Sequence, residues 1–413
     1  MAASTSRLLL PIAGLFLLIL APPSFAIAAA AVAPITIGET FTLISETLGE
    51  ERAILVSPPP GYARTDDRFQ VLYLLDGTEH LVHARGTVDF LARNGLMPQL
   101  IIVGIANTDR TRDLTPTRPE VHIGVDGLAR DLPSSGGADR FLDFLQYELV
   151  PRIETGYRTL PYRVLVGHSF GGLCTLHAFT ARPDLFGACM AISPTLRWDD
   201  EFPLRRLAAF LARGESRPRT LFVAMADEEA GDPGPTRFER LRQMLASASV
   251  AGLRASTLHL PHENHGTVVL PALFEGLQQV YDGWNLPRDP HTRRLAAGLE
   301  EVLAHHRGLS ERFGYTVEPS EMELNQVGYH ALGRGDVEDA IAIFRHNATV
   351  HPDSANPRDS LGEALERAGR LEEALREYEA AAEIAGRRGD ARADLYEANR
   401  DRLRERITAT TRP

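Results

Sequence analysis

The segment VLVGHSFGGL at residues 164–173 is the most informative one for the fold of the first part of the chain. Its apolar start predicts a buried strand, and the pattern that follows at 173–180 predicts a helix. A Gly-X-Ser-X-Gly sequence between a strand and a helix is typical of a sharp turn that exposes Ser169 in a strained conformation. Gly167 and Gly171 fit this turn because side chains there would collide. We therefore expect Ser169 to act as a nucleophile.

Strands and helices alternate on both sides of this motif. Short apolar runs bounded by Gly, Pro or Asp are typical of strands buried on both faces of a parallel sheet. Helical patterns separate them, as at 141–153, 238–245 and 270–281. The sequence predicts an α/β domain over residues 35–285, with a mostly parallel sheet and an antiparallel ribbon at one edge. The expected strands are 41–45, 52–57, 69–75, 99–106, 163–166, 188–192, 220–225 and 256–260.

A serine nucleophile needs a base, and in this fold the chain order is Ser, then an acid, then His. His265 lies in the loop after the last expected strand, where its imidazole can reach back over Ser169. His262, in the same loop, is the alternative. His168 is expected to point away from the serine's face of the turn. The sequence therefore favours His265 as the base.

The acid is expected directly after the strand at 220–225, where the chain reads Asp227, Glu228, Glu229. Its role is to fix the imidazole tautomer and to stabilise the imidazolium. In the common form of this loop, the acid stands three residues after the small residue that ends the strand, here Ala226. This spacing favours Glu229, with Asp227 second and Glu228 third.

The oxyanion of the tetrahedral intermediate needs two backbone N–H donors. One is expected from Phe170, directly after the nucleophile. The other is expected from the loop that ends the strand at 69–75, where Gly77 permits a close approach and Thr78 supplies the N–H.

Two arginines follow the strand at 99–106, on the side of the sheet that carries the reactive loops. Arg110 and Arg112 could hold a carboxylate or catecholate of a substrate by charge-assisted hydrogen bonds. The alternative is an internal ion pair with Asp109 or Asp113 that shapes the loop, and structural charge networks of this kind are common.

Four ordered segments together resemble the Putative esterase family of α/β-hydrolases, which includes the siderophore (enterobactin) esterases. The family is similar to the mycolyltransferases and S-formylglutathione hydrolases. The resemblance covers residues 36–285. The four segments are LLDG at 74–77, NTDRTRDLTP at 107–116, GHSFGG at 167–172 and ENHG at 263–266.

The resemblance implies Ser169 as nucleophile, His265 as base, and Thr78 and Phe170 as oxyanion donors. Some siderophore esterases work with a Ser–His dyad, which leaves the role of Glu229 open. The expected activity is hydrolysis of carboxylic esters, including bulky siderophore-type esters, without a metal or an organic cofactor. Two alternatives are acyl transfer to an alcohol through the same acyl-enzyme, and a noncatalytic periplasmic scaffold.

The C-terminal part repeats every 34 residues, with small residues where paired helices touch and an aromatic residue that fills the gap. This pattern predicts two tetratricopeptide repeats at 321–354 and 355–388, a capping helix at 395–407 within the domain 321–413, and a helical linker at 286–320. Such repeats bind protein partners through a concave surface; the alternative is a rigid extension or an oligomer interface. The matched pairs are Gly328 and Gly362, Gly335 and Gly369, Ala340 and Ala374, and Phe344 and Tyr378.

The N-terminus has the features of an export signal. Arg7 is the only charge before Glu39, an apolar run covers 8–21, and small residues stand at Ser24 and Ala26. We expect residues 1–26 to be a signal peptide and the mature protein to be periplasmic or secreted. No other apolar run is long enough to span a membrane.

Composition and charge exclude several classes of function. The chain of 413 residues has a formal charge of -11, and all 44 of its basic residues are Arg. The absence of Lys excludes a Schiff-base or Walker A lysine, and the lack of a basic run argues against nucleic-acid binding. No Cys/His spacing fits a zinc site. Cys174 and Cys189 are expected to be buried free thiols, with a disulfide between them as the alternative.

Overall fold

The structure is a computed structural model that describes residues 34–123, 128–214, 217–228, 236–287 and 298–410. The signal peptide expected at 1–26 and the expected acid Glu229 lie outside these ranges. Across the helices that the structure describes, we find none with the length and apolar character needed to cross a membrane.

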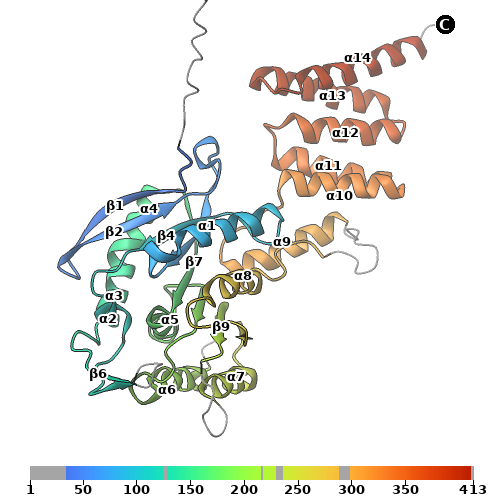
Figure 1. Cartoon of the computed structure of the whole chain (residues 1–413). Coiled ribbons are helices and arrows are strands. Elements are labelled where there is room, and N and C mark those ends of the chain that lie inside the picture. Colours follow the sequence, from blue (N-terminus) through green and yellow to red (C-terminus); the bar gives the residue numbers. More distant parts are fainter. Residues whose placement is uncertain (1–33, 124–127, 215–216, 229–235, 288–297, 411–413) are drawn as a thin grey trace, which may run out of the picture. The chain divides into compact units, whose positions relative to one another are not determined.

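An eight-stranded sheet organises the region between residues 39 and 260 (Figure 1). The strands lie in the order β1-β2-β4-β3-β7-β8-β9-β10. β2 runs antiparallel to both β1 and β4, and all other neighbours are parallel, which confirms the predicted edge ribbon and parallel sheet. The bounds are β1 Glu39–Ser45, β2 Glu50–Ser57, β3 Phe69–Leu74, β4 Leu100–Ile105, β7 Thr159–His168, β8 Ala188–Ile192, β9 Arg219–Ala226 and β10 Leu253–Leu260.

The central strands are apolar throughout because both faces of the sheet are covered. Along β3, Val71 and Tyr73 belong to one core, with residues of α3, α5 and α6, whereas Leu72 and Leu74 belong to the other, with residues of α1 and α8. Alternate side chains of one strand thus enter opposite cores. The helix bounds are α1 Gly77–Arg93, α2 Arg110–Leu114, α3 Ala138–Phe144, α4 Val150–Gly156, α5 Phe170–Ala181, α6 Trp198–Arg213, α7 Arg237–Ser247 and α8 Val269–Val280.

Several local features differ from the predicted pattern. The helix expected at 141–153 consists of α3 and α4 joined by a π-helical turn, Leu145–Leu149. A two-stranded hairpin, β5 His122–Ile123 and β6 Ala129–Arg130, was not predicted, since strands of two residues carry no periodicity.

The C-terminal part is helical, as predicted (orange to red in Figure 1). In α10 and α12, the paired glycines lie against the aromatic rings of the following helices. A Cβ atom on Gly328 would lie 2.4 Å from Phe344, and one on Gly362 would lie 2.7 Å from Tyr378. Only glycine permits this approach. The bounds are α9 Leu299–Phe313, α10 Glu321–Arg334, α11 Val337–Val350, α12 Ala355–Arg367, α13 Leu371–Arg388 and α14 Ala393–Thr410.

The two cysteines are buried free thiols, as expected from the sequence, and do not form the disulfide that was the alternative. Cys174 lies on α5 and Cys189 on β8, and neither is exposed to solvent. Burial raises the pKa of both thiols, that of Cys189 to about 12. Both are therefore protonated at neutral pH and poor nucleophiles.

Candidate active site

The turn between β7 and α5 holds Ser169 in a conformation that few residues adopt. Its backbone has φ 61° and ψ −116°, and its N–H donates a 2.9 Å hydrogen bond to the carbonyl of Ile192 at the end of β8. A conformation of this kind costs about 1–3 kcal/mol and persists only where the surroundings impose it. A Cβ atom on Gly167 would lie 2.2 Å from the carbonyl oxygen of Gly171, so this turn needs the glycine.

His265 connects Ser169 to a carboxylate. Its Nε2 lies 2.9 Å from the Ser169 hydroxyl, and its Nδ1 lies 2.8 Å from Oε2 of Glu228. A carboxylate at Nδ1 favours the tautomer with the proton on that nitrogen, which leaves Nε2 able to accept the serine proton. The serine–histidine pair expected from the sequence is thus within hydrogen-bond distance. His262, the alternative, is exposed.

The carboxylate on His265 belongs to Glu228, which the sequence placed third. The rule based on spacing favoured Glu229, which lies outside the described residues, and Asp227 is exposed. The N–H of Glu228 donates a 3.0 Å hydrogen bond to the carbonyl of Ala226, the last residue of β9. This tight turn directs the second residue after the strand into the site, one residue earlier than the rule expects.

Ser193 supports Glu228 from the neighbouring strand. Ser193 is buried, follows β8, and accepts a hydrogen bond from the N–H of Ala226. Burial acts to raise the pKa of Glu228, but hydrogen bonds with His265 and Ser193 hold that pKa below its ordinary value. Glu228 is therefore ionised at neutral pH.

The loop that carries His265 is fixed by its own side chains. The Asn264 side-chain oxygen accepts hydrogen bonds from the N–H groups of Gly266 and Thr267, at 2.9 and 3.0 Å. The N–H of Asn264 in turn donates to the Thr267 hydroxyl. These reciprocal bonds close a turn around His265, in the segment ENHG that carries part of the family resemblance.

The two expected oxyanion donors lie at the beginnings of helices. Thr78 is the second residue of α1, and Phe170 is the first residue of α5. Helix N-termini carry partial positive charge, which favours a developing oxyanion. Gly77 permits the approach of α1 to β4, because a Cβ atom there would lie 2.5 Å from the backbone of Gly104.

Arg110 lies in an ion pair that the sequence did not indicate. Its Nε and Nη2 donate to the two carboxylate oxygens of Asp76, at 2.7 and 2.9 Å, rather than to Asp109 or Asp113. Nη2 also lies 3.2 Å from the carbonyl oxygen of His168. The guanidinium is thus held at the site, but by the protein's own carboxylate.

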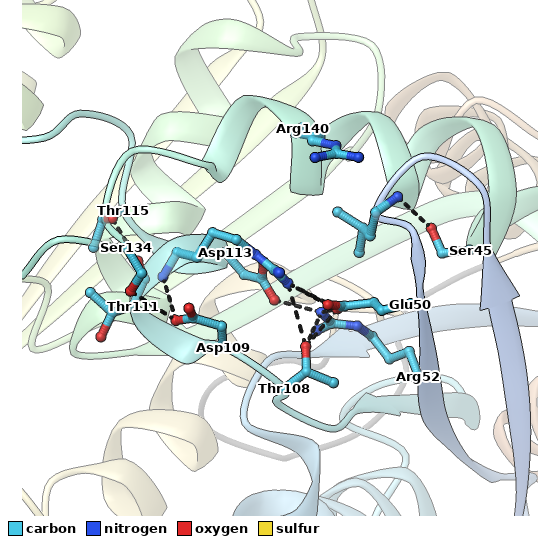
Figure 2. Close-up of polar contacts among 12 residues, drawn as sticks. Ser45, Glu50, Arg52, Thr108, Asp109, Thr111, Asp113, Thr115, Ser134 and Arg140 are labelled. Atoms are coloured by element: carbon cyan, nitrogen blue, oxygen red, sulfur yellow. Dashed lines mark hydrogen bonds and ion pairs between the residues drawn. The ribbon is translucent and has the colours of Figure 1, made fainter.

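Arg112 has different partners from Arg110 and belongs to a charge network with Glu50 and Asp113. Its Nη2 lies 2.9 Å from both carboxylate oxygens of Glu50, and its Nε lies 2.7 Å from Asp113. Figure 2 shows Glu50, Arg52, Thr108 and Asp113 converging at this network. The internal ion pair with Asp113, weighed as the alternative to substrate binding, is therefore present.

A row of histidine side chains extends from the site. The sequence did not predict that these histidines lie next to one another. The ring of His168 lies 4.7 Å from that of His265, and His80 lies 5.9 Å from His168 and 5.1 Å from His83. Burial and the neighbouring His265 lower the pKa of His168 to about 4, so this ring is neutral at neutral pH. Among the residues that the structure describes, no group of three or more His, Cys, Asp or Glu side chains could hold a metal ion.

Comparisons with known proteins show which proteins the chain is similar to. Residues 45–231 match the family described as Putative esterase. Ferri-bacillibactin esterase BesA of Bacillus subtilis is 29% identical over 232 residues, which cover 52% of this chain and 77% of that protein. A siderophore enterobactin esterase of Emericella nidulans is 32% identical over 252 residues, which cover 50% of this chain and 80% of that protein.

A solved structure extends the similarity to the fold. The crystal structure of an IroE-like serine hydrolase from Shewanella oneidensis has a TM-score of 0.64 and 30% sequence identity, and the match covers 76% of this chain and 99% of that one. The family match at residues 45–231 includes Ser169. The chain therefore belongs to the Putative esterase family, as a carboxylic ester hydrolase related to the siderophore esterases.

Proposed function

We propose that this enzyme cleaves esters through an acyl-enzyme on Ser169, with His265 as base and Glu228 as the acid that orients it. The observation that carries the proposal is the single imidazole of His265 between the Ser169 hydroxyl, at 2.9 Å, and the Glu228 carboxylate, at 2.8 Å. In this mechanism His265 takes the proton of Ser169 as the hydroxyl attacks the acyl carbon. His265 then gives this proton to the alcohol, which leaves as the ester C–O bond breaks. His265 next takes a proton from the water that attacks the acyl-enzyme and returns it to Ser169 as the acid leaves.

The developing oxyanion is stabilised by the N–H groups of Thr78 and Phe170. Removal of one such donor typically lowers kcat about 10²–10³-fold, so these backbone groups supply a large part of the catalysis. Electrostatic stabilisation acts on the carbonyl whatever the leaving group. We therefore expect hydrolysis of short aryl esters alongside the natural substrate.

The natural substrate we propose is a bulky siderophore-type ester. The support is the similarity to the esterases for ferri-bacillibactin and enterobactin. A panel of short aryl esters, thioesters, and ferric and iron-free trilactones tests this class. A preference in kcat/KM for trilactones is expected, and equal or lower values than for aryl esters would contradict it.

A fluorophosphonate probe tests the nucleophile. The wild-type enzyme should be labelled covalently, and Ser169→Ala should not be labelled. Cys174→Ala is a matched control, since its buried thiol lies on the same helix and plays no part in the mechanism. Equal labelling of wild type and Ser169→Ala would reject the assignment.

We further propose that the enzyme is exported and that its C-terminal helices are two tetratricopeptide repeats that bind a protein partner. Support comes from the signal-like sequence at 1–26 and from the packing of Gly328 and Gly362 on aromatic rings 16 residues further along the chain. N-terminal sequencing of the protein recovered from the periplasm or medium should begin after Ala26. Recovery of an intact N-terminus in the cytosol alone would contradict export.

A further inference from the structure

The helix α2 presents its two arginines to different surroundings. Arg112 and Asp113 join the network around Arg52, whose Nη2 lies 2.6 Å from Asp113 (Figure 2). Arg52 and Asp113 are each only 1% exposed. This buried pair fixes α2 to β2, the second strand from the edge of the sheet. Arg110, at the start of α2, therefore reaches the active site from a backbone that is already held in place.

The guanidinium of Arg110 touches both segments that carry the expected oxyanion donors. On one side it binds Asp76 through two hydrogen bonds, two residues before Thr78. On the other side it donates to the carbonyl of His168 at 3.2 Å, and its Cζ lies 5.5 Å from the ring centroid of Phe170. The loop after β3 and the turn after β7 thus meet at one planar, rigid group.

Asp76 needs such partners because its backbone is strained. It has φ 53° and ψ 44°, a left-handed conformation that is uncommon for residues other than glycine. Its carboxylate is almost fully buried and also accepts a 2.6 Å hydrogen bond from the side chain of Asn107. A Cβ atom on Gly171 would lie 3.2 Å from this carboxylate, so Asp76 also packs directly against the nucleophile turn.

We propose that Arg110 is a positioning residue that fixes the two oxyanion donors, the N–H groups of Thr78 and Phe170, relative to each other. This inference rests on the proposed function, since it concerns the same oxyanion. It differs from the substrate-binding role considered for Arg110, because Asp76 already takes both Nε and Nη2. An anionic substrate would have to displace that carboxylate.

A neutral substrate separates the two roles. With a neutral ester such as p-nitrophenyl butyrate, a substrate-binding arginine contributes nothing specific, whereas loss of a positioning residue lowers the rate of the chemical step. Arg110→Gln should lower kcat about 10²-fold, the scale seen for an imperfect oxyanion site or a displacement of about 1 Å. KM should change less than about threefold, because the N–H groups of Thr78 and Phe170 bind the oxyanion in the transition state and not the ground-state ester.

The matched control is Arg112→Gln. Arg112 stands on the same helix with similar side-chain exposure, 31% against 35% for Arg110, but its partners are Glu50 and Asp113. We expect kcat of folded Arg112→Gln to stay within about threefold of the wild type. Arg110→Lys serves if Arg110→Gln fails to fold; a lysine keeps the charge but cannot make the two-pronged bond, so the same loss of kcat is expected.

A boronic acid that forms a tetrahedral adduct supplies the second readout. Its affinity should fall in parallel with kcat in the Arg110 variants and stay unchanged in Arg112→Gln. Three results would each overturn the inference: wild-type kcat in Arg110→Gln, an equal loss in Arg112→Gln, or a rise in KM confined to anionic esters. A wild-type enzyme that neither cleaves esters nor reacts with a fluorophosphonate would instead refute the proposed function itself.

Discussion

Replacing Glu228 with Gln removes the negative charge beside His265 while keeping the size of the side chain at position 228. The Glu228 side chain is 11% exposed, and its Oε2 lies 2.8 Å from Nδ1, so water cannot readily take its place. The new amide can donate to Nδ1, which favours the tautomer with the proton on Nε2. That tautomer cannot accept the proton of Ser169. The imidazolium formed during attack also loses its counter-charge.

The expected loss in kcat for Glu228→Gln is about 10³-fold, within the limit of about 10⁴-fold for a triad acid. At about 1.4 kcal/mol for each factor of ten, this corresponds to about 4 kcal/mol of transition-state stabilisation. Steady-state hydrolysis of a p-nitrophenyl ester at neutral pH measures it. Asp227→Asn is the control, because Asp227 is exposed and its backbone N–H donates a hydrogen bond to the carbonyl of Glu263, which the substitution leaves in place.

Glu229→Gln completes the series, since spacing favoured that residue. We expect Glu229→Gln and Asp227→Asn to stay within about threefold of wild type in kcat. A loss below threefold in Glu228→Gln would refute the triad and leave a Ser–His dyad. A large loss in Glu229→Gln alone would show that the spacing rule, and not the contact of Glu228, identifies the acid.

Three further predictions concern stability and reactivity. Gly328→Ala should lower the free energy of unfolding of the helical region by about 1–3 kcal/mol, because the new Cβ atom would overlap the ring of Phe344. Gly333→Ala in the same helix is the control, because a Cβ atom there meets open space and should not destabilise the region. Denaturant titration followed by circular dichroism compares the two variants. Cys174 and Cys189 should not react with a thiol reagent until the protein unfolds, and rapid reaction in the native protein would contradict their burial. Burial acts to raise the pKa of Asp76, but Arg110 and Asn107 hold that pKa below its ordinary value, so the ionised carboxylate stabilises the fold at neutral pH. This contribution is lost as the pH falls below about 4. The difference in unfolding free energy between wild type and Asp76→Asn should therefore become smaller below that pH, and a difference that stays constant with pH would contradict this prediction.

Much of the fold could be predicted because the sheet is covered on both faces. Continuous apolar runs such as those of β4 and β8 indicate buried strands directly. The serine turn is equally local, since strand, glycines and helix follow one another within residues 164–173. The local sequence pattern does not predict the hairpin of β5 and β6, because each of these strands has only two residues.

The polar partners of the site could not be predicted because they are distant in the sequence. Arg110 has two neighbouring carboxylates in the chain, yet it binds Asp76, 34 residues away, through the meeting of two loops. Glu228 was ranked last because spacing describes an average loop, and the turn after Ala226 is tighter than that. The contact of His168 with His265 likewise depends on how the loop that carries His265 lies over the turn that holds Ser169.

The central claim is that Ser169 carries the acyl group during turnover. Acid quenching in the first turnovers with a p-nitrophenyl ester, followed by mass spectrometry of the intact protein and its peptides, tests this most directly. We expect a mass increase of one acyl group, located on the peptide that contains GHSFGG and absent in Ser169→Ala. Ester hydrolysis that persists in Ser169→Ala, or an acyl group found only on another residue, would contradict it.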